Sequence, residues 1–329
     1  MKNIMYIFPG QGSQYQGIGY DIYNDFIVAQ NIYDQASSIL GYDIAELSFN
    51  DPENKIGLTE FTQPVLLTHQ IACWSVFNEL THDLIKPKMT AGHSLGEYTA
   101  LVVSGSLSFE QGLSLVRKRG QFMSQYGQGS MLAMPIEEKE AKVFSEQFNC
   151  QVASLNLLKQ TVIGGTDHDI DACQNAFQNL FPKKRTVKLD TEGAFHTDLM
   201  REAAEQFKVH LGEVNFTPSD LKVLSNVTSS SHRQDGRHTR DLLYKQLYRP
   251  VDWLGCMETS MAFDVDIIVE FGGGIGTGDS PKEKRPNLES ITKKNFRNSD
   301  QDIKYFSGIN TDSIKQSAKS LIELIQHND

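Results

Sequence analysis

The sequence predicts an α/β fold, with a large domain interrupted by a small subdomain. Three observations lead to this prediction. Strand-like and helix-like segments alternate along the chain, which is typical of α/β proteins. Ser94 has G-x-S-x-G spacing in "GHSLG" (92–96), between a strand-like and a helix-like segment, as in a nucleophile elbow. Residues 127–192 show the order β-α-β-β-α-β, which indicates a ferredoxin-like unit.

The first part of the large domain, residues 1–126, is predicted from hydrophobic periodicity and one helix cap. The apolar run "IMYIF" (4–8) indicates a buried strand that is followed by a loop. Apolar residues at helical spacing indicate a helix over 66–80. "SFEQ" (108–111) matches a capping box, so a helix should begin there and reach 126. The remaining expectations are a strand within 86–92 and a helix over 95–107.

The subdomain is expected over 127–192, and the large domain continues over 193–329. Its expected strands are 130–134, 150–155, 161–165 and 185–190, with helices over 136–148 and 167–180. Beyond it we expect an amphipathic helix over 198–214, a strand over 222–228, a helix over 239–254 and a buried strand over 264–271. A long loop over 272–287, a polar tail and a final helix over 313–326 complete the chain.

The composition limits the possible functions. The chain has 329 residues and a formal net charge of −10, which argues against a nucleic-acid-binding protein. The basic clusters 183–185, 282–285 and 293–294 are interpreted as scattered solvated charge. The four cysteines form no C-x-x-C pair, and no apolar stretch is long enough for a membrane span. We therefore expect a reduced, cytoplasmic protein without a structural metal.

Ser94 has two interpretations. A serine hydroxyl is a poor nucleophile unless a base and oxyanion donors lie beside it. Gly92 and Gly96 would let the strand turn sharply into a helix and expose the hydroxyl, with the N–H of Leu95 facing the oxyanion. In the alternative interpretation Ser94 is an ordinary helix N-cap. The strand–turn–helix context favours the nucleophile.

Two residues stand out as partners for Ser94. His196 follows the subdomain directly in "GAFH" (193–196) and would face the large domain as a base, although a structural role is open. No acid is evident, so a dyad whose imidazole is oriented by a carbonyl fits as well as a triad. Arg119 lies on the flank of an apolar helix stripe. It either pairs with a structural carboxylate or binds a substrate carboxylate.

These residues occur in segments that resemble one family. The segments are "FPGQGSQ" (8–14), "GHSLGEYTAL" (92–101), "RGQFM" (119–123), "NLLKQTVIGG" (156–165), "GAFH" (193–196) and "KQLYRPVDW" (245–253). Together they resemble the malonyl-CoA:acyl carrier protein transacylases. The resemblance implies an α/β-hydrolase-like large domain with an inserted ferredoxin-like subdomain.

The resemblance also implies a role for individual residues. It implies that Ser94 is the nucleophile and His196 the base and acid, and that the backbone N–H groups of Gln11 and Leu95 form the oxyanion hole. It further implies that Arg119 binds the malonyl carboxylate. Gln246 would help to hold His196, His93 and Asn156 would line the pocket, and Phe195 would fill space near the substrate α-carbon.

The implied reaction is malonyl transfer from malonyl-CoA to the phosphopantetheine thiol of an acyl carrier protein, without a cofactor, by a protein that we expect to be a monomer. Four features resemble the free-standing acyltransferases of modular polyketide synthases: "LGYDIAEL" with "DPENK" (40–55), "TEFTQP" (59–64), "GAFH" (193–196) and the glycine-rich tail over 270–294. We expect the loop "GGGIGTG" (272–278) near the site entrance. The alternatives are a housekeeping fatty-acid transacylase, a hydrolase that clears acyl groups from carrier proteins, and an inactive docking partner. Methylmalonyl as a substrate also stays open.

Overall fold

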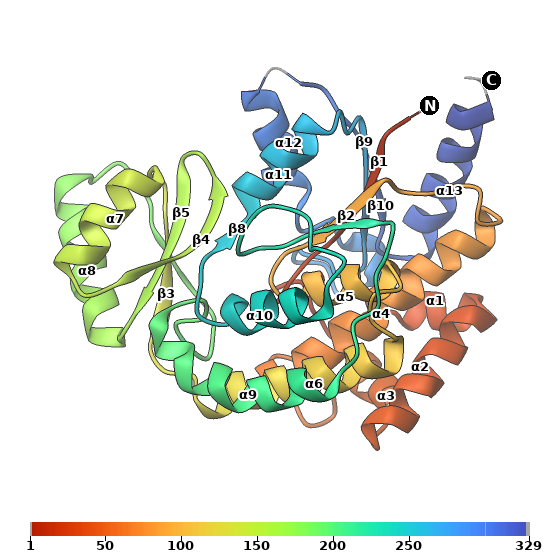
Figure 1. Cartoon of the computed structure of the whole chain (residues 1–329), viewed down its shortest axis with the longest axis horizontal. Helices are drawn as coiled ribbons and strands as arrows, with labels where there is room; N and C mark the ends of the chain where they lie inside the picture. The colour runs from red at the N-terminus through yellow and green to blue at the C-terminus, as the bar shows by residue number, and fades with distance from the viewer. Residues whose placement is uncertain (1, 300, 327–329) are drawn as a thin grey trace.

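Two five-stranded sheets organise the protein (Figure 1). The computed structural model describes residues 2–299 and 301–326. The larger sheet has the order β10-β9-β1-β2-β7, and every neighbouring pair in it is parallel. Its strands are β1 Ile4–Phe8, β2 Met89–Gly92, β7 Lys222–Leu224, β9 Ile267–Phe271 and β10 Lys304–Gly308. The smaller sheet has the order β6-β3-β5-β4-β8.

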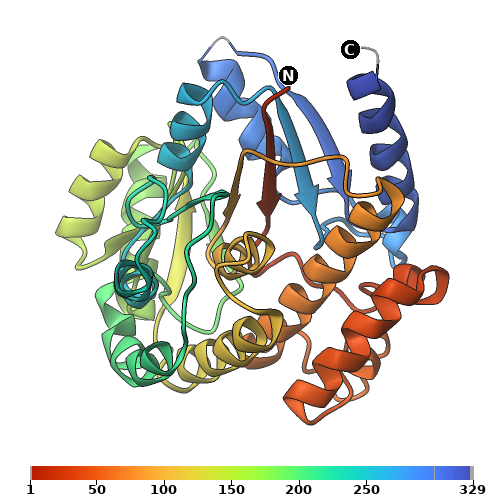
Figure 2. The same cartoon turned by 45° about the vertical axis from the view of Figure 1, so that its right-hand side comes forward.

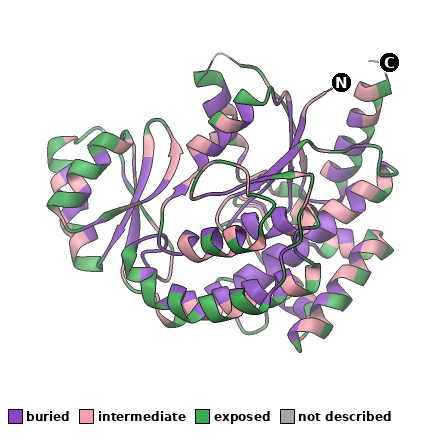
Figure 3. Cartoon of the chain, viewed as in Figure 1, coloured by how far each residue is buried: buried purple, intermediate pink, exposed green. Residues whose placement is uncertain are grey.

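Helices cover both faces of the larger sheet, as a parallel sheet requires. All five residues of β1 are buried (Figure 3). Ile4, Tyr6 and Phe8 face one apolar cluster, and Met5 and Ile7 face another, because successive side chains in a strand point to opposite faces. Helices α4, α5 and α6 contribute to the first cluster, and α11 and α12 to the second (Figure 2).

The helices of the large domain lie on both sides of the subdomain in the chain. Before the subdomain they are α1 Tyr20–Asp25, α2 Ile27–Leu40, α3 Ile44–Phe49, α4 Thr59–Leu80, α5 Gly96–Val103 and α6 Phe109–Gln125. After it they are α9 Arg201–Glu213, α10 Gly236–Gln246, α11 Trp253–Ala262, α12 Glu289–Asn298 and α13 Thr311–Gln326. Within the described residues, none of the helices is long and apolar enough to span a membrane.

The smaller sheet has the strand order of a ferredoxin-like unit. The ferredoxin-like unit consists of β3 Ser130–Met134, α7 Glu138–Gln147, β4 Gln151–Leu157, β5 Gln160–Gly165, α8 Asp167–Leu180 and β6 Val187–Leu189. A fifth strand, β8 (Val251–Asp252), comes from the large domain and pairs in parallel with β4. The predicted fold class, an α/β domain with a ferredoxin-like insert, is confirmed. The exact boundaries at 126 and 193 stay predictions.

Several predicted elements differ from the structure. The helix expected over 239–254 is two helices, because α10 ends at Gln246, a turn and Pro250 follow, and β8 precedes α11. Pro250 could not continue a helix without losing a backbone hydrogen bond. The strand expected over 222–228 ends at Leu224. The polar tail contains α12 and β10, which the sequence analysis did not predict.

Gly96 is required by close packing between α5 and β1. A Cβ atom at this position would lie 2.1 Å from the carbonyl oxygen of Phe8. We expect Gly96→Ala to lower the free energy of unfolding by about 3 kcal/mol or more, because backbone atoms would have to shift. The control is Gly212→Ala in α9, where a Cβ meets no atom within 4 Å; it should raise stability by about 0.5–1 kcal/mol. Urea unfolding measures both, and equal stabilities would contradict the expectation.

Candidate active site

Ser94 lies on a sharp turn at the carboxyl end of the larger sheet. It follows β2 and precedes α5 with a φ of 51°, a conformation that costs energy for a residue other than glycine. Asn226, just beyond the end of β7, holds both sides of the turn. Its Oδ1 accepts from the Ser94 N–H at 2.7 Å, and its Nδ2 donates to the Gly92 carbonyl at 2.7 Å. The hydroxyl of Ser94 is thereby presented in a fixed place.

His196 is hydrogen-bonded to Ser94, with 2.9 Å between His196 Nε2 and Ser94 Oγ. Its Nδ1 lies 2.6 Å from the backbone oxygen of Gln246. A carbonyl oxygen only accepts hydrogen bonds, so Nδ1 carries the proton. Nε2 then has a free lone pair that accepts from the Ser94 hydroxyl. A main-chain carbonyl, not a carboxylate, therefore orients this imidazole.

The surroundings of His196 keep its imidazole neutral. Burial, followed by the positive charge of Arg119, lowers the pKa of His196 to about 3, and the hydrogen bond to Gln246 opposes this shift only in part. A neutral imidazole is the form that can remove a proton from a hydroxyl. The imidazole of His196 is thus neutral throughout the physiological pH range.

Arg119 is a buried cation that points at the nucleophile. Its side chain is 1% exposed. One terminal nitrogen donates to Gln63 Oε1 at 2.9 Å, and the other donates to Ser94 Oγ at 3.0 Å and to Gln246 Oε1 at 3.1 Å. Its Nε has no partner, and no carboxylate of the described residues lies within 4.0 Å of the guanidinium. Burial lowers the pKa of Arg119. A buried guanidinium in this setting favours an anionic ligand.

The backbone N–H groups of Gln11 and Leu95 have no protein acceptor within residues 2–299 and 301–326. Leu95 directly precedes α5, where helix N–H groups favour negative charge. The Gln11 side chain donates to Thr59 Oγ1 at 3.0 Å, which anchors its loop to α4. The glycine-rich loop also lies against this segment, because the Gly274 N–H donates to the Ser13 carbonyl at 2.8 Å. Gly10, which precedes Gln11, packs against the turn that carries Ser94, because a Cβ built on Gly10 would lie 2.6 Å from the His93 carbonyl oxygen.

His93 and Asn156 form a pair that links the two sheets. His93 Nε2 lies 2.9 Å from Asn156 Oδ1, and Asn156 belongs to β4 of the smaller sheet. Burial lowers the pKa of His93, so this imidazole is neutral and donates to Asn156. Phe195 directly precedes His196, and its side chain is buried in the larger apolar cluster.

Three residues of the polar network were missed by the sequence analysis. Gln63 receives a hydrogen bond from Arg119, Asn226 holds the turn, and Glu97 accepts from Gln246 Nε2 at 2.7 Å. Gln63 and Glu97 lie within the motifs "TEFTQP" and "GHSLGE", which were quoted for the resemblance alone. Asn226 had a positional signal, because it lies two residues beyond the carboxyl end of β7, a strand of the parallel sheet.

Metal-binding side chains do not gather at this site. In the described parts of the chain, no group of three or more His, Cys, Asp or Glu side chains is arranged to hold a metal ion. All four cysteines are free and buried. The Ser94 hydroxyl lies within hydrogen-bond distance of both the neutral imidazole of His196 and the buried guanidinium of Arg119, an arrangement that suits acyl transfer.

Known proteins share this architecture. Residues 5–253 match the acyl transferase domain family. A malonyl CoA-acyl carrier protein transacylase of Bacillus subtilis is 37% identical over 301 residues, which cover 88% of this chain and 93% of the relative. The polyketide biosynthesis malonyl CoA-acyl carrier protein transacylase PksC of the same species is 35% identical over 254 residues, or 76% and 86% of the two chains. A malonyl CoA-acyl carrier protein transacylase structure from Clostridium perfringens has a TM-score of 0.88 at 27% identity and covers 99% of this chain and 100% of that one. The chain therefore belongs to the malonyl CoA-acyl carrier protein transacylase family of acyltransferases.

Proposed function

We propose that the protein transfers a malonyl group from malonyl-CoA to the phosphopantetheine thiol of an acyl carrier protein, through a malonyl ester on Ser94. One observation carries the choice of acyl group. The buried guanidinium of Arg119 lies 3.0 Å from Ser94 Oγ and has an unpaired Nε. An acyl group that carries a carboxylate would satisfy this donor, whereas a neutral acyl chain would leave it buried and unpaired.

In the first half-reaction Ser94 Oγ attacks the thioester carbonyl while His196 Nε2 takes the hydroxyl proton. The N–H groups of Gln11 and Leu95 stabilise the oxyanion of the tetrahedral intermediate. The carbon–sulfur bond then breaks, and His196 returns its proton to the departing CoA thiolate. The backbone oxygen of Gln246 stabilises the imidazolium that exists between these two steps. The products are malonyl-Ser94 and free CoA.

In the second half-reaction the carrier thiol gives its proton to His196 and attacks the malonyl ester. The carbon–oxygen bond to Ser94 breaks, and His196 returns the proton to Ser94 Oγ. In this proposal His93 and Asn156 line the acyl pocket, and Phe195 beside His196 restricts space at the substrate α-carbon, which favours malonyl over methylmalonyl. If water replaced the thiol, the protein would be a hydrolase.

Mass spectrometry of the intact protein tests this function. The protein is incubated with malonyl-, methylmalonyl- or acetyl-CoA, with and without a phosphopantetheinylated carrier protein. We expect a malonyl adduct on Ser94 that disappears when the carrier is added, together with malonyl-carrier. Release of acetyl from the carrier faster than malonyl loading would instead support the hydrolase, and absence of any adduct would support an inactive docking protein.

We further propose a carrier protein of a polyketide synthase as the natural acceptor. The segments "TEFTQP" and "GGGIGTG" support this choice. A relative named for polyketide biosynthesis is 35% identical, and a relative whose name states no pathway is 37% identical, so identity does not decide between the two roles. The test compares kcat/KM for a polyketide carrier protein with that for the fatty-acid carrier protein of the same cell. A preference for the fatty-acid carrier would assign the housekeeping role.

The low pKa of His196 predicts a flat pH profile for malonyl loading. A lowered pKa means that the imidazole stays neutral as the pH falls past the ordinary value of about 6.5. We expect the single-turnover loading rate to change little between about pH 8 and 5.5. In Arg119→Gln the pKa of His196 should rise, because a neighbouring positive charge is removed, and acetyl loading should then fall at a higher pH. An acid limb near 6.5 in the unaltered protein would contradict this expectation.

A further inference from the structure

Glu97 is a fully buried carboxylate one helical turn beyond Ser94, and its side chain is 0% exposed. Three donors converge on it. The Asn226 N–H lies 3.0 Å and Gln246 Nε2 2.7 Å from Oε2, and His232 Nε2 lies 2.8 Å from Oε1. Burial of a carboxylate is tolerated only where such donors replace water. None of the steps proposed above uses this group.

The first consequence concerns the orientation of the Gln246 amide. Gln246 Nε2 donates to Glu97 Oε2 and, at 2.9 Å, to the Ser94 carbonyl. Both of these groups only accept hydrogen bonds, so the amide nitrogen must face them. Gln246 Oε1 is then turned toward Arg119, whose terminal nitrogen it accepts at 3.1 Å. An inverted amide would direct its N–H groups at the guanidinium.

The second consequence concerns charge. Glu97 and Arg119 are joined through one amide, because Gln246 donates to the carboxylate and accepts from the guanidinium. The negative charge of Glu97 also raises the pKa of Arg119 against the effect of burial. Through this amide Glu97 therefore holds Arg119 in one place without occupying the face that Arg119 turns to Ser94.

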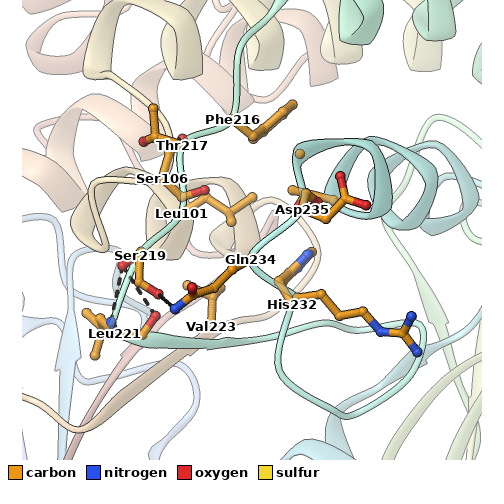
Figure 4. A pocket seen from close by; sticks show the side chains of 13 residues that line it. Leu101, Ser106, Phe216, Thr217, Ser219, Leu221, Val223, His232, Gln234 and Asp235 are labelled. Atoms are coloured by element: carbon orange, nitrogen blue, oxygen red, sulfur yellow. Dashed lines mark hydrogen bonds between the residues drawn. The ribbon is translucent and has the colours of Figure 1, made fainter.

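His232 lies on the other side of Glu97, in the wall of a small pocket (Figure 4). Its Nδ1 is buried and has no hydrogen-bond partner. Nδ1 can therefore carry the ring proton in a variant in which Nε2 has to accept a hydrogen bond instead of donating one. In Glu97→Gln the new amide N–H could then donate to His232 Nε2, while the amide oxygen still accepts from Asn226 and Gln246.

We propose that Glu97 is a positioning residue for malonyl selectivity, which fixes the Gln246 amide with its oxygen toward Arg119 and so orients Arg119 for the substrate carboxylate. This proposal rests on the proposed function. The proposal predicts unequal effects on two substrates, whereas loss of a purely structural residue would reduce transfer of both equally. Loss of Glu97 should reduce malonyl transfer more than acetyl transfer, because acetyl has no carboxylate for Arg119 to bind.

The test measures kcat/KM for loading of malonyl and of acetyl from their CoA esters by the unaltered protein and by Glu97→Ala, Glu97→Asp and Glu97→Gln. In Glu97→Ala we expect the malonyl-to-acetyl ratio to fall about tenfold, the usual scale for a hydrogen bond to a charged group. Glu97→Asp, which withdraws the carboxylate by one methylene, should give a smaller fall in the ratio. Glu97→Gln should keep most of the ratio, because it retains the acceptor.

The possible results separate three cases. Equal loss of malonyl and acetyl loading in all variants would overturn the proposal and leave Glu97 a structural residue. An unchanged malonyl-to-acetyl ratio in Glu97→Asp would also overturn the proposal. The comparison of Glu97→Asp with the unaltered protein remains a test even if Glu97→Ala does not fold. Failure of the unaltered protein to load malonyl would instead reject the proposed function. Thermal unfolding of each variant shows which ones are folded.

Discussion

Ser94→Ala should abolish the malonyl adduct and reduce malonyl transfer by roughly 10⁴-fold or more, the scale found when a catalytic serine is removed from an acyl-transfer enzyme. The physical reason is the loss of the hydroxyl oxygen that lies 2.9 Å from His196 Nε2 and would form the ester. Intact-protein mass spectrometry after incubation with malonyl-CoA measures the adduct directly. An adduct that formed at the unaltered rate would place the acyl group elsewhere.

His196→Ala is the control for this result. It leaves Ser94 and Arg119 in place but removes the base, so the same adduct should form slowly, with a rate reduced by about 10²–10⁴-fold. The combination of no adduct in one variant and a slow adduct in the other separates the nucleophile from the base. Equal behaviour of the two variants would indicate that both had lost the folded site, which thermal unfolding can check.

Arg119→Ala should reverse the substrate preference. Removal of one partner of a buried, hydrogen-bonded charge pair costs about 2–5 kcal/mol, so kcat/KM for malonyl loading should fall by roughly 10²–10³-fold. Acetyl loading should fall much less, because acetyl makes no contact with a guanidinium. Rates with the two CoA esters, measured by loss of the thioester, give the comparison.

Arg119→Lys is the matched variant. It keeps the positive charge but loses the planar fork that donates to Gln63, Gln246 and Ser94, so malonyl loading should lie between that of the unaltered protein and that of Arg119→Ala. If malonyl and acetyl loading fell by the same factor in both variants, Arg119 would act on Ser94 alone, and the assignment of a carboxylate-bearing substrate would fail.

Much of the fold could be predicted because its signals are local. The buried run of β1, the Ser108 cap of α6 and the order of elements over 130–189 each lie within a short stretch of sequence. Ser108 Oγ does accept from the Gln111 N–H, at 3.2 Å. β10 was missed because its central residues are only half-buried at the edge of the sheet. The break after Gln246 was missed because the apolar pattern continued through Pro250.

The candidate site was predictable only in part, because only some of its residues belong to a local sequence motif. Ser94 and its glycines form a local motif. His196 and Arg119 stood out by their own context with a structural role still open, and the resemblance alone joined them to Ser94 and added Gln246. The orienting partner of His196 is a main-chain carbonyl, and every residue has one, so no residue type could identify it. The places of Asn226 and Glu97 likewise depend on which strands are neighbours, which a single sequence does not state.

The pairing of β8 with β4 has a consequence for recombination between relatives. Residues 127–192 look like a cassette, yet Ser154 and Leu155 of that segment pair with Val251 and Asp252, which lie outside it. Gln246, five residues before β8, supplies the carbonyl that orients His196. A chimaera that takes residues 127–192 from another family member should therefore take β8 from the same relative. Otherwise β4 and β8 would come from different proteins, and a mismatch in their pairing would move Gln246 and the imidazole that it orients. Natural exchange of acyl specificity should leave crossover points beyond Asp252.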